Sequence, residues 1–197
     1  MIAYDGGRFH LYLEHGYRGA GSGALLMESV RLFCGSIGLP CPGEETLTKT
    51  SGGKPYFDAP GAPRFSVSHS GELWACAISR DRIGFDVECR KARDWRSIAE
   101  RFFHPAERDL ALAGGEGAFF LLWTAKESYV KYLGVGIDES FSTFCLARGD
   151  AVTGDALGVA FAWPPVPEGY YACVCTPAEQ AAILNVYQNM STARPQS

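Results

Sequence analysis

The sequence contains no apolar run of about eighteen residues, the length that a membrane-spanning helix needs. Its first residues also lack the basic start and apolar stretch of a signal peptide, so we expect a cytoplasmic protein. A surplus of basic residues is missing too, because 18 Lys and Arg stand against 22 Asp and Glu. Without a broad basic surface, the chain is not expected to bind nucleic acid.

Paired CxxC motifs are absent as well, which argues against the usual cysteine pattern of a zinc site. The seven cysteines stand at positions 34, 41, 76, 89, 145, 173 and 175. We interpret most of them as small buried apolar residues in a reducing compartment. Hydrophobic residues make up 47% of the chain, enough for an ordinary core in one domain or in two small packed halves.

Hydrophobic spacing predicts clustered strands and helices, which favours an α+β fold with largely antiparallel sheet. Strands are expected at residues 9–14, 65–70, 73–79, 82–89, 141–147, 157–163 and 170–175. Helices are expected at residues 26–37, 95–103, 105–113 and 117–133, with a last one from about 177. Residues 41–63 should form a long surface connection. A strand–helix–strand set on each side of residues 80–81 predicts two halves, 1–80 and 81–197.

Two carboxylates stand two residues apart in the expected strand 82–89. Asp86 and Glu88 should point to one face, while the apolar residues that alternate with them point to the other. Same-face neighbours lie roughly 6.6 Å apart, at about 3.3 Å per residue, so the two groups can converge on one cation. The alternative interpretation is an exposed strand face with two solvated acids.

On the expected helix 117–133, Glu127 and Lys131 are four residues apart and therefore neighbours on its surface. They could form a helical salt bridge worth about 0.2–0.5 kcal/mol, or they could join Asp86 and Glu88. Lys126 falls in the apolar stripe of this helix, where a lysine is costly unless it meets an anion. Three carboxylates with lysines suit a magnesium ion that holds a phosphate anhydride, with lysines stabilising the departing oxygen charge.

Residues 68–70 (SHS) resemble part of a serine-hydrolase site, but the strand geometry excludes that function. Adjacent residues on a strand point to opposite faces, so His69 cannot serve Ser68 or Ser70 as a base. His69 is then either a structural hydrogen-bonding residue or a phosphate contact, and spacing leaves both open.

Five segments, taken in order, resemble the surfactin-synthetase-activating type of 4′-phosphopantetheinyl transferase. They are 53–57 (GKPYF), 65–71 (FSVSHSG), 84–88 (GFDVE), 101–103 (RFF) and 123–136 (WTAKESYVKYLGVG). Each motif is modest alone, but five in order over about residues 52–145 are specific. The resemblance implies two similar α+β halves, related by a pseudo-twofold axis, with coenzyme A in the cleft between them.

The resemblance also implies an activity. It would be magnesium-dependent transfer of 4′-phosphopantetheine from coenzyme A to a serine of an apo acyl or peptidyl carrier protein. The other product would be adenosine 3′,5′-bisphosphate.

The site residues carried over from the family fall into three groups. Asp86, Glu88 and Glu127 would hold magnesium, and Glu127 is also the candidate base. Lys131 would stabilise charge on the diphosphate. Lys54 and His69 would contact the 3′-phosphate of coenzyme A, and Ser68 and Ser70 would line the nucleotide pocket. We add Lys126 to the coenzyme A-binding residues.

The N-terminal third departs from the family pattern, which usually carries basic residues there. Arg18 and Arg31 are the only Lys or Arg residues between Arg8 and Lys49. A binding module without turnover is therefore one alternative, and a different magnesium-dependent phosphoryl or nucleotidyl enzyme is another. The basic run 90–101 is either a solvated face or a docking site for an acidic carrier protein. We expect a monomer, with both halves of the site in one chain.

Overall fold

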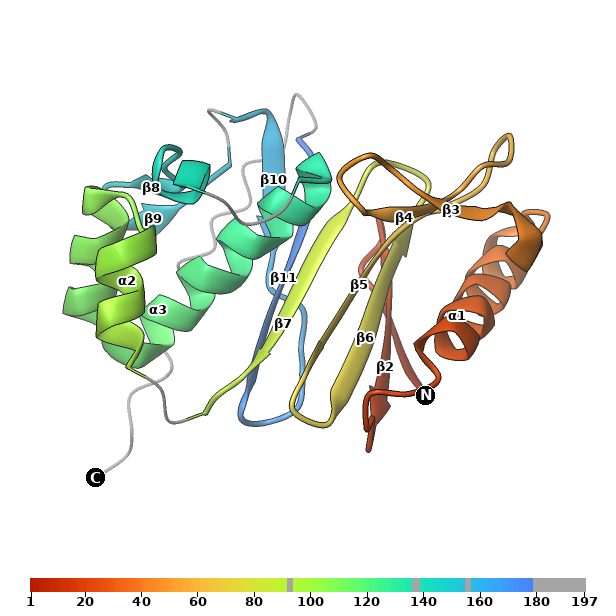
Figure 1. Cartoon of the computed structure of the whole chain (residues 1–197), viewed down its shortest axis with the longest axis horizontal. Helices are drawn as coiled ribbons and strands as arrows, with labels where there is room; N and C mark the ends of the chain where they lie inside the picture. The colour runs from red at the N-terminus through yellow and green to blue at the C-terminus, as the bar shows by residue number, and fades with distance from the viewer. Residues whose placement is uncertain (92–93, 136–138, 155–156, 179–197) are drawn as a thin grey trace.

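The computed structural model describes residues 1–91, 94–135, 139–154 and 157–178 (Figure 1). Its first half is an antiparallel sheet in the order β1-β2-β6-β5. The strands are β1 (Ile2–Asp5), β2 (His10–His15), β5 (Arg64–Ser70) and β6 (Leu73–Ser79). Helix α1 (Ser22–Ile37) covers one face of this sheet, because its buried residues pack against Tyr12, Trp74 and Ile78.

The second half is an antiparallel sheet in the order β10-β11-β7. Its strands are β7 (Gly84–Cys89), β10 (Val159–Ala162) and β11 (Tyr170–Pro177). Helix α3 (Pro105–Leu133) packs along β7 and β11, and α2 (Trp95–Phe102) packs on α3. The α+β class with antiparallel sheets, predicted from the spacing, is confirmed. None of the helices described here is long and apolar enough to cross a membrane.

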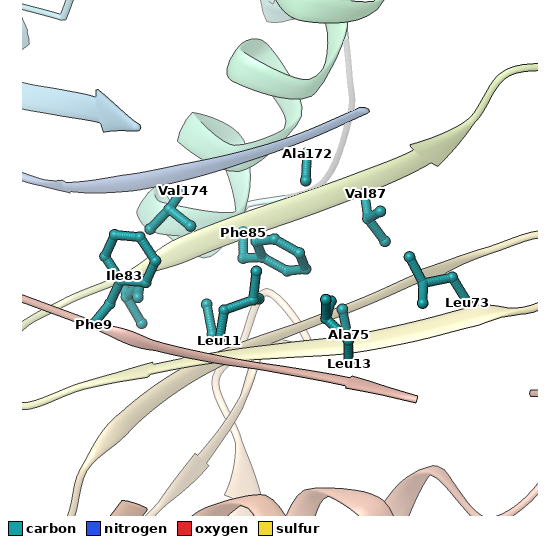
Figure 2. Close-up of a cluster of buried hydrophobic side chains, with 11 residues drawn as sticks. Phe9, Leu11, Leu13, Leu73, Ala75, Ile83, Phe85, Val87, Ala172 and Val174 are labelled. Atoms are coloured by element: carbon teal, nitrogen blue, oxygen red, sulfur yellow. The ribbon is translucent and has the colours of Figure 1, made fainter. Parts of the chain in front are cut away.

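The two sheets face each other across one buried core (Figure 2). Leu11 and Leu13 of β2 and Leu73 of β6 come from the first sheet, and Phe85 and Val87 come from β7. Because α1 and α3 cover the outer faces, the molecule is layered helix, sheet, sheet, helix (Figure 1). The predicted alternation along β7 is confirmed, since its apolar residues enter this core and Asp86 and Glu88 do not.

Apart from β1, which adds a fourth strand to the first sheet, the two sheets use the same strand order. Among the three remaining strands of each, the first pairs with the last, and the last pairs with the middle one: β2-β6-β5 and β7-β11-β10. This shared order is what two similar halves would show. The pseudo-twofold axis and the boundary between halves 1–80 and 81–197 stay predictions.

The sequence predicted two helices, at 105–113 and 117–133, and α3 has a break between these two ranges. Gly115 adopts φ 75° and ψ −164°, a conformation outside the helical region. This reversal lets Glu107, before the break, reach Lys126, after it, at 2.8 Å. A straight helix would separate residues 19 apart by roughly 28 Å, at 1.5 Å per residue, so the two parts of α3 fold against each other.

The expected strand 141–147 is wrong. A 3₁₀ turn occupies Glu139–Ser142, and only Ala147–Arg148 (β8) form a strand, paired with Ala151–Val152 (β9). The backbone N–H of Leu146 donates to the Glu107 carboxylate at 2.7 Å, so it is not available to a neighbouring strand.

Besides β9 and the 3₁₀ turn at Glu139–Ser142, four more short elements were not predicted. They are β1 and, inside the expected surface connection, a 3₁₀ turn (Glu44–Thr46) and the paired strands β3 (Leu47–Lys49) and β4 (Pro55–Phe57). The expected last helix falls mostly on residues 179–197, outside the described residues.

Candidate active site

Two edge strands and one helix meet at the candidate site. Strand β5 is an edge of the first sheet, β7 is an edge of the second, and the two lie side by side. Helix α3 approaches β7 closely because Gly84 has no side chain. A Cβ at Gly84 would overlap the carbonyl oxygen of Ser128 and the backbone nitrogen of Tyr132. The close approach brings the end of α3 against the carboxylates of β7.

Side chains of β5 connect the two edges. The Phe85 N–H donates to Ser66 Oγ at 3.0 Å, and the Cys89 N–H donates to Ser70 Oγ at 3.0 Å. Between them, Ser68 Oγ donates to Asp86 Oδ1 at 2.8 Å. These alternate serines share one side of β5, and they join the two sheets through hydrogen bonds.

Asp86 is the centre of the group and is only 4% exposed. Its Oδ1 accepts from Ser68 Oγ and from Lys131 Nζ, each at 2.8 Å, and Lys131 Nζ also lies 2.8 Å from Ser68 Oγ. Burial raises the pKa of Asp86, and the Lys131 ammonium opposes that rise. Its other oxygen, Oδ2, is buried and has no hydrogen-bond partner among the described residues.

Two further carboxylates lie beside Asp86. Glu88 Oε2 accepts from Ser70 Oγ at 3.0 Å, and Glu127 of α3 is 8% exposed. Burial, followed by the charge of Asp86, raises the pKa of Glu127 to about 7, while Lys131 lowers it. The structure therefore brings together the three carboxylates and the lysine that the sequence singled out.

The three carboxylates suit a divalent cation chemically, although their oxygen atoms do not surround a single point in this structure. Among the described residues, no three His, Cys, Asp or Glu side chains are arranged as a metal-binding group. However, Asp86 Oδ2 is buried without a partner, and the charges of Asp86 and Glu88 both raise the pKa of Glu127. A cation would relieve that repulsion, and carboxylate oxygens are ligands that magnesium prefers.

Lys54 and His69 lie at different places around this group. Lys54 Nζ donates to the carbonyl oxygens of Ile83 at 2.7 Å and Lys131 at 2.6 Å. Burial, followed by the nearby Arg82 charge, lowers the pKa of Lys54 to about 8. His69 is exposed, with its ring centroid 5.3 Å from that of Tyr17. It therefore lies apart from the buried serines of β5.

Lys126 pairs with the carboxylate of Glu107, whereas we expected it to bind coenzyme A. Its side chain is fully buried, with Nζ 2.8 Å from Glu107 Oε2 and 2.8 Å from the Phe144 carbonyl oxygen. The ammonium also lies 3.8 Å from the centroid of the Phe144 ring. Since a buried ion pair of this kind leaves it no route to a ligand in this structure, we reassign Lys126 from coenzyme A binding to a structural role.

A cavity opens beside Lys54. Its volume is about 620 Å³, and its lining includes the cations Lys54, Arg64 and Arg82 with the Tyr132 ring. A smaller cavity of about 230 Å³ extends from Lys54 to Lys131. Arg64 and Arg82 could not be singled out from the sequence, because a single arginine next to a strand has no distinguishing pattern.

The basic run 90–101 has partners within the chain. Arg90 Nε lies 2.7 Å from Glu116 Oε2, and the Arg96 and Arg101 guanidinium groups lie over the rings of Trp95 and Phe102. Residues 92 and 93 are outside the described residues. Docking of a carrier protein at this run stays a prediction.

Comparison with known proteins points to one family. Residues 82–175 match the model of the 4′-phosphopantetheinyl transferase superfamily. The chain is 34% identical over 148 residues to 4′-phosphopantetheinyl transferase gsp of Aneurinibacillus migulanus, covering 70% of this chain and 61% of the relative. It is 39% identical over 105 residues to 4′-phosphopantetheinyl transferase HetI of a Nostoc species, covering 49% and 44%.

A third relative is 4′-phosphopantetheinyl transferase Sfp of Bacillus subtilis, 37% identical over 97 residues, covering 47% of this chain and 42% of the relative. The chain thus spans less than two thirds of the length of each of these relatives. The matches agree with the resemblance carried by the five motifs, and all three relatives carry the same transferase name. The chain belongs to the 4′-phosphopantetheinyl transferase superfamily.

Proposed function

We propose that this chain transfers the 4′-phosphopantetheine group of coenzyme A to a serine hydroxyl of an apo acyl or peptidyl carrier protein. Such carriers serve fatty-acid, polyketide or nonribosomal peptide synthesis. The observation that carries the proposal is the buried group in which Asp86 meets Ser68, Lys131 and Glu127 at the contact between the two halves. The transferase names of the relatives agree with it.

Asp86, Glu88 and Glu127 would hold a magnesium ion, through the unpartnered Oδ2 of Asp86 among other oxygens. When bound, magnesium would draw charge off the diphosphate of coenzyme A and make its phosphorus more electrophilic. Ser68 and Ser70 hold Asp86 and Glu88 by hydrogen bonds, so the orientation of both carboxylates is set by β5.

Glu127 is the proposed base. Without a cation the pKa of Glu127 is raised to about 7. A bound cation would lower this pKa, so that the carboxylate is ionised and able to accept a proton near neutral pH. It would take the proton of the carrier serine while the serine oxygen forms a bond to the phosphorus that bears pantetheine. The bond between that phosphorus and the bridging oxygen breaks, and adenosine 3′,5′-bisphosphate leaves with the bond electrons.

Lysines would bind the anionic parts of coenzyme A. Lys131, whose side chain is 30% exposed, can donate to the diphosphate and stabilise the charge that develops on the leaving group. Lys54 uses two of its three N–H groups on carbonyl oxygens, and the third is proposed for the 3′-phosphate. His69 lies apart from Lys54, beside Tyr17, and its contact with the same phosphate stays a prediction. Ser68 would lie at the wall of the nucleotide site. Because Ser68 and Asp86 belong to the two halves of one chain, a monomer would contain the whole site.

The test is intact-mass spectrometry of an apo carrier protein incubated with this chain, coenzyme A and magnesium. The expected result is a mass gain of one phosphopantetheine, abolished by Asp86→Ala and by EDTA. Glu28→Gln, which changes an exposed glutamate of α1, serves as the matched control and should leave the gain intact. Binding of coenzyme A with no mass gain on any of several carriers would favour the binding module instead.

A further inference from the structure

The C-terminal end of α3 has carbonyl groups that its own helix cannot satisfy. The last four carbonyls of any helix lack a partner within it. In α3 these belong to residues 130–133. The first of them, on Val130, accepts from the N–H of Gly134 at 2.9 Å and from that of Val135 at 3.3 Å. Gly134 can close the helix in this way because it adopts φ 81°.

Side chains from distant positions bind the other three carbonyls. Lys54 Nζ donates to the Lys131 carbonyl oxygen at 2.6 Å. Arg82 donates through Nε to the Tyr132 carbonyl and through Nη2 to the Leu133 carbonyl, both at 2.6 Å. The Arg82 guanidinium also lies 4.7 Å from the centroid of the Tyr132 ring. Thus each of the last four carbonyls of α3 has a hydrogen-bond donor, and Arg82 is the donor to two of these carbonyls.

Arg82 joins the two elements that carry the reacting groups. It stands two residues before Gly84, where β7 begins, and four residues before Asp86. The carbonyls it binds lie one and two residues after Lys131, in the last turn of α3. Since a cation at a helix C-terminus also suits the helix dipole, the position of this turn along β7 depends on the Arg82 guanidinium.

We infer that Arg82 is a positioning residue: it fixes the last turn of α3 and thereby holds the Lys131 ammonium against Asp86. Lys54 contributes to the same end through the Lys131 carbonyl. The kinetic part of this inference rests on the proposed transferase function, whereas the effect on the helix end does not.

Hydrogen exchange tests the helix end without any activity. Arg82→Gln should speed exchange of the amides at residues 131–135 by about tenfold, because opening of a helix end is a local event. Arg80→Gln is the matched control, since it removes the same charge from an exposed residue of the same connection. Unchanged exchange at 131–135 in Arg82→Gln would overturn the inference, whatever the activity of the chain.

Kinetics in two backgrounds test the route through Lys131. With Lys131 present, Arg82→Gln should lower kcat about tenfold and leave the KM for coenzyme A nearly unchanged, because a misplaced group mainly weakens transition-state contacts. In a Lys131→Met background the same change should lower kcat less than about twofold. Arg82→Lys, which retains a donor and the charge, should restore part of the rate.

Two kinetic results would overturn the inference. Equal losses in both backgrounds would mean that Arg82 acts through general stability, and a raised KM for coenzyme A would make it a direct ligand. If the wild-type chain transfers nothing to any carrier protein, it is the proposed function that fails. The exchange measurement then decides the inference about the helix end alone.

Discussion

Glu127 is a buried carboxyl group whose neighbours include two further carboxyl groups, and this position has a consequence for stability. Burial and the Asp86 charge raise its folded-state pKa from 4.5 to about 7. A carboxyl group with a raised folded pKa favours the folded state below its unfolded pKa, and this contribution is lost as the pH rises through the folded value. In the absence of magnesium, the wild-type chain should therefore lose stability between about pH 4.5 and pH 7.

Glu127→Gln removes this titration. At about pH 8 the variant should be more stable than the wild type by on the order of 2–3 kcal/mol, and the difference should shrink towards pH 4.5. Urea denaturation across this pH range, with EDTA present, measures the difference. Glu100→Gln, at an exposed position, should show no such pH dependence. A difference for Glu127→Gln that does not vary with pH would contradict the prediction.

The buried pair of Lys126 and Glu107 is a second residue-scale test. Lys126→Met keeps the length of the side chain but leaves the Glu107 carboxylate buried without its cation. Breaking one side of a buried ion pair costs about 3–5 kcal/mol. Adding Glu107→Gln should recover part of that loss, because it removes the uncompensated charge. The recovery should be incomplete, since the N–H groups of His104 and Leu146 bond different carboxylate oxygens and the single amide oxygen can accept from only one of them.

Urea denaturation of the single and double variants gives both free energies of unfolding. The control is Lys49→Met, at an exposed residue of β3, which should change stability by less than about 0.5 kcal/mol. A double variant less stable than Lys126→Met would show that Glu107 stabilises the fold without its partner.

At the scale of elements, the approach of α3 to β7 depends on Gly84. A Cβ there would overlap backbone atoms of Ser128 and Tyr132, and backbone cannot rotate away as a flexible side chain can. Gly84→Ala should therefore push α3 off the strand and destabilise the fold by about 1–3 kcal/mol. It should also reduce transfer activity beyond the loss of folded protein, because Glu127 and Lys131 move with the helix.

Gly35→Ala is a suitable comparison for Gly84→Ala, since Gly35 lies within α1 with nothing near its Cβ position. Alanine there should stabilise the chain by about 0.5–1 kcal/mol through helix propensity. Thermal denaturation and the transfer rate per folded molecule measure both variants. Equal behaviour of the two would rule out a special role for the close approach.

Elements with strong periodicity could be predicted from the sequence, and the reasons are visible in the structure. The helix over 26–37 ends at Gly38, which caps it in the left-handed conformation, and the break between 113 and 117 falls at Gly115. Short strands could not be predicted in the same way. Strands β3 and β4 have three residues each, too few for an alternating pattern to stand out from a loop.

The carboxylates of the candidate site could be found from the sequence because local patterns place them, two on a strand and one on a helix face. The partner of Lys126 could not. Glu107 is 19 residues away, and only the reversal at Gly115 brings the two together. The same limit applies to Arg82, whose carbonyl partners are about fifty residues away and carry no side-chain signature.

At the scale of the whole molecule, the two halves share a core and a row of polar contacts. Phe85 and Val87 of the second sheet pack against leucines of the first (Figure 2), while the serines of β5 bond β7 from the side. Neither half can bury its inner sheet face without the other. Because the candidate site also takes groups from both edges, folding of the two halves and assembly of the site should be one event.

This view predicts that a core mutation in one half destabilises both halves equally. Phe85 is fully buried between the sheets, so Phe85→Ala should cost about 3–5 kcal/mol. Native-state hydrogen exchange should show the slowest amides of β6 and of β11 losing the same free energy of protection, since both then exchange through global unfolding. Leu32→Ala, at a leucine of α1 that is 49% exposed, should leave both strands nearly unchanged. If β6 retained its protection while β11 lost it, the first half would be an independently stable unit. The site at the contact between the halves would then open without unfolding of the first sheet.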